Sequence, residues 1–358
     1  MKAVLSNLDF EYSLTGRVAK IPARQRERWS TILRLLPDAR DATVAQPGQI
    51  YETLFAWGFS PDARNFVSPG QRSRLPSHEA VIVANDKTES HRIENVLGCS
   101  LPGSVLVASE DACRQAIQSC RHPWILKHPF GVSGRDRVRG VARHIEDAHM
   151  SWARSVFQSG FSLVFEPWLE RKYEFSVHYD LSPQGDLACR GACELLTDRS
   201  GVFRGHFVDP LLEVGEGVCR MHEAALTGLA RQGYHGPVSV DSMAGFLGEQ
   251  AVLRPITEIN ARWSFGRLAL ALRDCVPAGW SYLWWHPSAR RFPKEGGESP
   301  EIHSKRRDAG LFRLPDFSDR AGRSKTILAA GFETREETFS ALGLDPPRLP
   351  EQLAKLLR

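Results

Sequence analysis

Short apolar runs separated by polar, Gly and Pro positions recur along the first quarter of the chain. In order, they predict a strand at residues 3–5, a helix at 24–36, a strand at 42–45, a helix at 49–57 and a strand at 80–84. Strands that alternate with helices are typical of a parallel sheet. We therefore expect residues 1–85 to form a small α/β domain.

The pattern changes twice after residue 85. Residues 86–165 predict an α+β lobe with helices at 85–97, 111–120 and 145–158 and strands at 105–107, 124–127, 138–141 and 163–165. Residues 166–276 predict antiparallel strands at 175–179, 187–193, 238–243 and 253–260, with a helix at 211–232. The remainder, 277–358, is rich in Pro, Gly and Arg and predicts only a closing helix at 352–357, so its role stays open.

Composition adds little beyond a globular class. The 358 residues carry 46 Lys and Arg against 42 Asp and Glu, and 42% are hydrophobic. This weak positive charge does not predict a nucleic-acid partner. The seven cysteines include no C-x-x-C pair, which argues against zinc and disulfide frameworks. No apolar run is long enough to span a membrane, and the N-terminus lacks signal-peptide features. We expect a reducing, cytoplasmic setting.

The stretch WILKHPFGVSGRDRVRG, residues 124–140, places a lysine at the end of an apolar strand and follows it with a glycine-containing loop. Such a loop lets backbone N–H groups approach an anion. Lys127 precedes Gly131, whereas a P-loop lysine follows its glycines, so a Walker-type site is disfavoured. An ordinary surface turn is the alternative interpretation of this stretch alone.

The stretch RPITEINARWSFG, residues 254–266, carries polar side chains on one face of a predicted strand. Glu258 and Asn260 alternate with Ile259, and Arg262 joins them if the extended form continues. Carboxylate and amide oxygens suit Mg²⁺. Asp241, in GPVSVDSMAG, would lie beside Glu258 if residues 238–243 and 253–260 pair as a hairpin. A polar edge-strand face is the alternative to a metal site.

A third stretch, FSLVFEPWLERKYEF, places a bend at Glu166-Pro167-Trp168-Leu169 between two strands. Pro167 removes one N–H group and stiffens the bend. Backbone groups at such a bend are available to the edge of a base, and Glu174 could accept hydrogen bonds from ribose hydroxyls.

In this order, the three stretches resemble the ATP-grasp superfamily of ligases over residues 80–270. The resemblance implies a two-lobed ATP-grasp fold, with a small lobe at 86–165 and a large lobe at 166–276, preceded by a Rossmann-like domain at 1–85. By position, it implies nucleotide contacts from two lysines, the loop, the bend and the ribose carboxylate: Lys87, Lys127, Gly131, Ser133, Gly134, Arg135, Glu166, Trp168, Leu169 and Glu174. It implies metal ligands at Asp241, Glu258 and Asn260, and catalytic roles for Lys127 and Arg262.

Two positions depart from the family pattern. Arg135 replaces a glycine often found in the loop, and Ser239 stands where several relatives have a phosphate-binding arginine. Arg190 and Arg204 are the alternative phosphate contacts.

The resemblance implies an ATP-dependent ligase that uses ATP with Mg²⁺ or Mn²⁺. It would join a small-molecule or peptide carboxylate to an amine or thiol through an acyl phosphate, with no nucleic-acid or membrane partner. The resemblance also implies a homodimer, because members of this superfamily are often dimers. A phosphotransferase and a non-catalytic nucleotide-binding regulator stay open as alternatives, although the complete set of lysines and metal-type ligands argues against the regulator.

Overall fold

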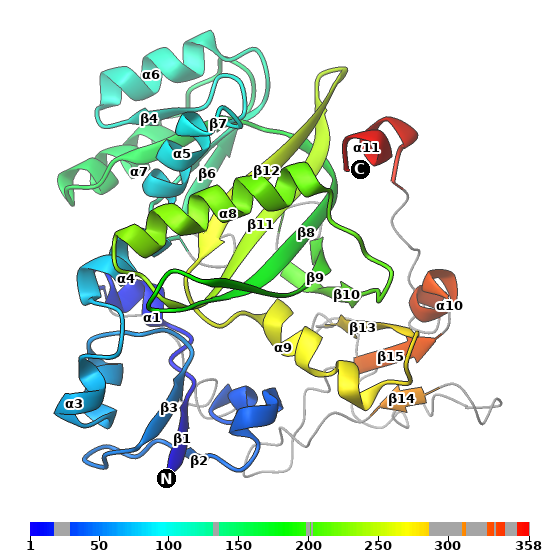
Figure 1. The fold of residues 1–358 in the computed structure, drawn as a ribbon. Helices are drawn as coiled ribbons and strands as arrows, with labels where there is room; N and C mark the ends of the chain where they lie inside the picture. The colour runs from blue at the N-terminus through cyan, green and yellow to red at the C-terminus, as the bar shows by residue number, and fades with distance from the viewer. Residues whose placement is uncertain are drawn as a thin grey trace, which may run out of the picture.

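The computed structural model describes residues 1–17, 29–131, 136–197, 201, 203–285, 310–312, 328–332, 334–340 and 349–357. Within them lie a small parallel sheet, a four-stranded antiparallel sheet and a large antiparallel sheet (Figure 1). Among these residues, no helix combines the length and apolarity needed to cross a bilayer.

The N-terminal sheet is parallel, with strand order β2-β1-β3. The elements of this region are β1 (Lys2–Leu5), α1 (Phe10–Ser13), β2 (Thr43–Val44), β3 (Thr53–Ala56), α3 (Pro69–Arg72), α4 (His78–Asn85) and short 3-10 turns at Ile32–Leu35, Pro37–Ala39 and Asp62–Phe66. The parallel pairing confirms the predicted α/β character. Whether this region is a Rossmann-like domain, and whether the domains divide at residues 85, 165 and 276, stay predictions.

Two predictions in this region were wrong. Residues 80–84 form part of helix α4, not a strand, because the Ser77 hydroxyl caps the helix by accepting from the Ala80 N–H at 3.1 Å. A five-residue apolar run cannot distinguish a buried strand from a buried helix turn. The helix predicted at 49–57 is replaced by β3, which pairs with β1. Of the helix predicted at 24–36, residues 24–28 lie outside the described residues, and 32–35 form a 3-10 turn.

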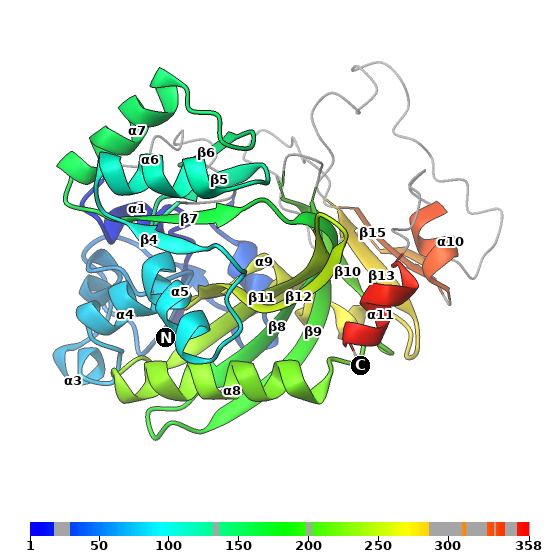
Figure 2. The same ribbon diagram turned by 90° about the horizontal axis from the view of Figure 1, so that it is seen from above.

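The second sheet has the order β4-β7-β5-β6 and is antiparallel. Its strands are β4 (Val105–Val107), β5 (Trp124–Lys127), β6 (Arg137–Gly140) and β7 (Leu163–Pro167). Helices α6 (Glu110–Ser119) and α7 (Asp147–Gln158) pack against it around buried Trp124 and Phe165 (Figure 2). Helix α5 (Lys87–Val96) leads into this lobe. The elements predicted for this lobe are confirmed.

In the part of the chain that the structure describes, the large sheet contains eight antiparallel strands in the order β12-β11-β8-β9-β10-β13-β15-β14. They are β8 (Glu170–Leu181), β9 (Leu187–Thr197), β10 (Phe203–Val208), β11 (Gly236–Leu247), β12 (Gln250–Asn260), β13 (Ser281–Trp285), β14 (Gly310–Phe312) and β15 (Leu328–Phe332). The helices around it are α8 (Glu216–Arg231), α9 (Phe265–Ala271), α10 (Arg335–Ser340) and α11 (Glu351–Leu357), with a 3-10 turn at Arg273–Cys275. The sequence did not predict β10, α9 or the C-terminal strands, and the latter extend this same sheet.

Candidate active site

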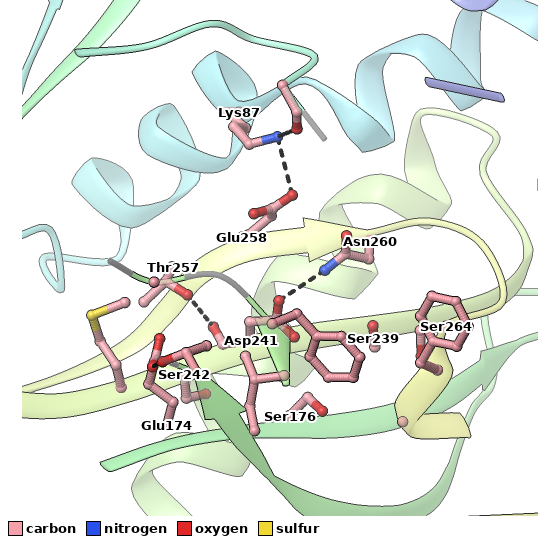
Figure 3. A pocket seen from close by; sticks show the side chains of 18 of the residues that line it. Lys87, Glu174, Ser176, Ser239, Asp241, Ser242, Thr257, Glu258, Asn260 and Ser264 are labelled. Carbon is pink, nitrogen blue, oxygen red and sulfur yellow. Dashed lines mark hydrogen bonds and ion pairs between the residues drawn. The ribbon is translucent and has the colours of Figure 1, made fainter. Parts of the chain in front are cut away.

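The predicted hairpin is present, and it places Asp241 on β11 opposite Glu258 on β12. Asn260 donates from Nδ2 to Asp241 Oδ2 at 3.0 Å (Figure 3). All three side chains line a cleft of about 230 Å³ between the large sheet and the small lobe. The oxygen-rich cluster expected from the sequence is therefore assembled by strand pairing.

An irregularity in the hairpin lies directly behind this cluster. The register runs from Asp241 opposite Glu258 to Met243 opposite Arg254, so β12 carries two extra residues there. Pro255 has no N–H to give to a ladder. Hydroxyl groups compensate, since Ser242 Oγ donates to the Pro255 carbonyl at 2.6 Å and Thr257 Oγ1 donates to the Asp241 carbonyl at 3.0 Å. Irregularities of this kind often occur next to active sites, where they change the direction in which a side chain points.

The two facing carboxylates have different electrostatic surroundings. Burial and, to a smaller extent, the negative charge of Glu258 raise the pKa of Asp241 to about 7. Desolvation also acts to raise the pKa of Glu258, but Lys87 and Arg262 outweigh it and lower that pKa. Lys87 Nζ lies 3.0 Å from Glu258 Oε1 and also donates to the Gly131 carbonyl at 2.7 Å. One carboxylate of the pair therefore has a direct cationic partner, whereas the other accepts from a neutral amide.

Lys127 lies at the end of β5, where the sequence predicted it, and it lines the cleft. Its Nζ atom is 2.6 Å from Glu166 Oε2. Lys87 reaches the same cleft from the first turn of α5. Gly131 lies at the rim, whereas Ser133, Gly134 and Arg135 fall outside the described residues.

The bend at 166–169 lies apart from the cleft lining. Glu166 and Leu169 are buried, and the Glu166 side chain is occupied by ion pairs rather than turned to the cleft. Trp168 borders a neighbouring hollow of about 580 Å³, which shares Arg171, Glu174, Leu195 and Thr197 with the cleft. The hollow beside Trp168 is the space next to the bend, and a contact between the backbone of the bend and a base stays a prediction.

Glu174 on β8 lines both spaces. Arg171 Nη1 donates to its two carboxylate oxygens at 3.2 and 3.3 Å, and the Thr197 hydroxyl donates to Oε2. The Arg171 guanidinium lies 4.8 Å from the Trp168 ring centroid, and that of Arg139 lies 3.6 Å from it. The carboxylate predicted for ribose is therefore held in place by protein donors at the edge of the cleft.

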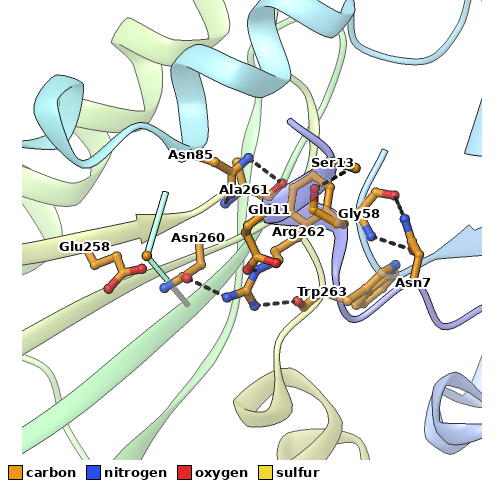
Figure 4. Close-up of polar contacts among 12 residues, drawn as sticks. Asn7, Glu11, Ser13, Gly58, Asn85, Glu258, Asn260, Ala261, Arg262 and Trp263 are labelled. Atoms are coloured by element: carbon orange, nitrogen blue, oxygen red, sulfur yellow. Dashed lines mark hydrogen bonds and ion pairs between the residues drawn. The ribbon is translucent and has the colours of Figure 1, made fainter. Parts of the chain in front are cut away.

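Arg262 reaches the cluster from beyond the end of β12, and a turn rather than strand alternation brings it there. It donates from Nη2 to Asn260 Oδ1 at 2.9 Å, and from Nη1 to the Trp263 carbonyl at 3.1 Å (Figure 4). Its Nε atom forms an ion pair with Glu11 Oε1 at 2.5 Å.

The segment that carries Arg262 is anchored to the N-terminal region (Figure 4). Asn85 Oδ1 accepts from the Ala261 N–H at 3.0 Å, and its Nδ2 group donates to the Ala261 carbonyl at 3.4 Å. The Trp263 N–H donates to the Trp57 carbonyl at 3.0 Å. The N-terminal region therefore contributes directly to the placement of Arg262.

Sequence reasoning missed a row of small polar groups on the cleft floor. Ser176, Ser264 and His206 line the cleft beside Ser239, which the sequence had singled out, and Ser176 Oγ lies 3.0 Å from His178 Nε2. Alternation along β8 was a usable signal, because Ser176 lies two residues after Glu174 on the same face.

The alternative phosphate arginines are not at the cleft. Arg190 pairs with Asp180 at 2.7 Å, and neither Arg190 nor Arg204 lines the cleft. Arg137 and Arg171, which the sequence did not single out, do line it.

No protein-family model and no curated protein matches the sequence. Solved structures do match. The biotin carboxylase–β-γ-ATP complex from Campylobacter jejuni has a TM-score of 0.55 at 16% identity, over 95% of this chain and 83% of that one. N5-carboxyaminoimidazole synthetase from Staphylococcus aureus with ADP has a TM-score of 0.54 at 11% identity, over 96% and 95%. N5-carboxyaminoimidazole synthase from Aspergillus clavatus, with ADP and 5-aminoimidazole ribonucleotide, has 0.54 at 14%, over 99% and 98%.

Biotin carboxylase and N5-carboxyaminoimidazole synthetase are ATP-grasp enzymes, and the similarity extends over nearly the whole chain. The chain therefore has the ATP-grasp fold, which confirms the resemblance expected from the sequence at the level of fold.

Proposed function

We propose that the protein is an ATP-dependent ligase that joins a carboxylate to an amine, or to a thiol, through an acyl phosphate, with release of ADP and phosphate. One observation carries the proposal: two lysines and an arginine meet two facing carboxylates in a single cleft. These groups are Lys87, Lys127, Arg262, Asp241 and Glu258. The fold supports the proposal, because the solved structures that resemble this chain include complexes with ATP or ADP.

The residues fit a divalent metal. Asp241 and Glu258 face each other, and repulsion between two neighbouring carboxylates contributes to the raised pKa of Asp241. A cation would relieve that repulsion, and Asn260 adds an amide to the hard oxygen donors that Mg²⁺ or Mn²⁺ prefers. We propose that Asp241, Glu258 and Asn260 hold it. When bound, such an ion neutralises charge on the β- and γ-phosphates of ATP.

The proposed reaction has two steps, and the cationic side chains of the cleft would stabilise the negative charge in both. A substrate carboxylate oxygen attacks the γ-phosphorus, the bond to the β,γ-bridging oxygen breaks, and ADP leaves. The amine next attacks the acyl carbon, the C–O bond to phosphate breaks, and phosphate leaves while the amine loses a proton. Lys127 and Lys87 would neutralise the phosphates, and Arg262 the acyl phosphate. Binding both substrates in one cleft supplies the orientation.

A search for ADP release across panels of carboxylates and amines tests this function. With an active carboxylate and hydroxylamine as the nucleophile, we expect an ATP-dependent hydroxamate. A stable phosphorylated product in place of the hydroxamate would identify a phosphotransferase, and AMP with pyrophosphate would identify adenylate chemistry. ATP binding without turnover of any panel member would favour a regulator. Small-molecule or peptide substrates, a cytoplasmic setting and a homodimer stay predictions.

A further inference from the structure

A chain of four buried or half-buried charges runs behind the cleft and is separate from the carboxylate pair. Arg254 on β12 donates from Nε and Nη2 to the two oxygens of Glu94 on α5, at 2.6 and 2.7 Å. The same Nη2 atom donates to Glu166 Oε1 on β7 at 2.7 Å. The other oxygen of Glu166 holds Lys127 Nζ at 2.6 Å. The order is therefore Glu94, Arg254, Glu166 and Lys127.

The chain of charges is balanced, with two carboxylates and two cations. The side chains of Glu94, Arg254 and Glu166 are 1%, 3% and 5% exposed, whereas that of Lys127 is 20% exposed. Buried charges are tolerated only when each is paired and hydrogen-bonded. Of the four charged groups, only Lys127 therefore lines the cleft.

The buried carboxylate of Glu166 is shared by two cations, Arg254 and Lys127. Burial on its own would raise its pKa, but Arg254 and Lys127 together lower it below the ordinary value. Whatever share of the Glu166 charge Arg254 takes is not available to neutralise Lys127. The ammonium group is thus oriented by Glu166 while it keeps positive charge for an anion in the cleft.

Two of these residues, Glu94 and Arg254, also help to dock α5 on β12. Lys87 and Glu94 are seven residues apart, which puts them on one face of α5 about 10.5 Å apart along its axis. Glu258 and Arg254 are four residues apart on β12, about 13 Å in extended form. The pairs Lys87–Glu258 and Glu94–Arg254 form two rungs of opposite polarity between the two elements. Arg254 therefore reaches Lys127 through Glu166, and it also helps to hold in place the helix that carries Lys87.

We infer that Arg254 is a positioning residue for nucleotide binding. It partly neutralises the Glu166 carboxylate, so that Glu166 orients the Lys127 ammonium group without cancelling its positive charge toward the phosphates. The inference rests on the proposed function, because the anion it serves is the phosphate chain of ATP. It assigns a role to a residue that contacts neither the cleft nor the metal-type ligands.

The test is calorimetric titration of each variant with a nonhydrolysable ATP analogue and Mg²⁺. The double variant Glu94→Gln/Arg254→Met removes one charge of each sign and leaves Glu166 paired with Lys127 alone. We expect its Kd to rise about tenfold, because Glu166 then holds the ammonium by itself. Glu94→Gln alone frees Arg254 for Glu166, and we expect its Kd to fall about threefold.

Lys127→Met provides the reference. We expect it to weaken binding, and we expect the double change to add nothing in the Lys127→Met background, because both act through the same ammonium group. A merely structural role would lower the unfolding midpoint of the double variant and add to the Lys127→Met loss. If the double variant does not fold, Glu94→Gln decides, since a structural defect would not tighten binding.

The outcomes separate the two proposals. Absence of binding to the unaltered chain would overturn the proposed function together with this inference. Binding to the unaltered chain that is lost in Lys127→Met but unchanged in the double variant would overturn the inference alone. Unchanged or weaker binding by Glu94→Gln would also overturn it, as would normal binding by Lys127→Met.

Discussion

Two charged clusters share strand β12 and differ in how their charges are paired. The inner cluster, defined by Glu94, Arg254, Glu166 and Lys127, matches two carboxylates with two cations. The outer cluster has two carboxylates at the cleft, Asp241 and Glu258, and two cations there, Lys87 and Arg262. A third carboxylate, Glu11, pairs with Arg262 away from the cleft lining. In the inner cluster every charge has a partner within the protein, and Lys127 alone of the four also faces the cleft. In the outer cluster Asp241 accepts from a neutral amide rather than from a cation, which suits a bound metal ion. We therefore expect the loss of a charge to cost more stability at the inner cluster than at the outer cluster.

The largest expected effect is on stability at the inner cluster. Arg254→Met leaves two buried carboxylates with one cation, and we expect the free energy of unfolding to fall by about 3–5 kcal/mol. Urea denaturation checks this. The matched control is Arg220→Met, which breaks an exposed pair with Glu216 on α8 and should cost less than about 0.5 kcal/mol. Equal losses for both variants would contradict the contrast.

The outer cluster should respond in turnover rather than in stability. Glu258 is 34% exposed at the cleft, so Glu258→Ala opens no core cavity but removes one of two metal-type carboxylates. We expect turnover to fall about 100-fold or more, with little change in the unfolding midpoint. Glu216→Ala is the control for loss of an exposed carboxylate. Full turnover in Glu258→Ala, with any active carboxylate, would show that the metal assignment is wrong.

Substitution of Arg262 tests the link between the cleft and the N-terminal region. We expect Arg262→Ala to lower hydroxamate formation about tenfold or more, because the acyl phosphate loses a cationic partner. The change also leaves Glu11 buried without its ion-pair partner, so the Glu11→Gln/Arg262→Ala variant should recover stability without recovering activity. Recovery of both would assign Arg262 a structural role only.

The smallest expected effect is a pH dependence from Asp241. Its pKa in the folded protein is about 7, raised above the ordinary 3.8 by burial and by Glu258. The folded state therefore holds this proton more tightly than the unfolded state. Its contribution to stability is fully present below about pH 3.8 and is lost as pH rises through about 7. Without divalent metal, stability should fall by about 1 kcal/mol between pH 6 and pH 7. Asp241→Asn should remove this slope, and an unchanged slope would assign it to another group.

The sequence predicted what depends on local pattern. The helix predicted at 85–97 is present as α5, which carries Lys87, and Asp86 caps it by accepting from the Thr88 N–H at 2.7 Å. The β11–β12 hairpin followed from two alternating strands around a short turn. Residues 80–84 were misassigned because their local pattern is ambiguous.

What the sequence could not show depends on contacts between distant positions. Glu94 and Arg254 are 160 residues apart, and nothing in either neighbourhood indicates that they meet. The ion pair between Glu11 and Arg262 is formed only when the N-terminal region packs against the end of β12.

Transfer of ¹⁸O from the substrate carboxylate to phosphate tests the central claim most directly. In an acyl-phosphate mechanism, the carboxylate oxygen that attacks ATP leaves with the released phosphate. With a carboxylate found by the ADP screen and labelled with ¹⁸O, we expect one labelled oxygen in inorganic phosphate for each ligation, measured by mass spectrometry. Unlabelled phosphate together with complete ligation would contradict the account, as would label recovered in AMP.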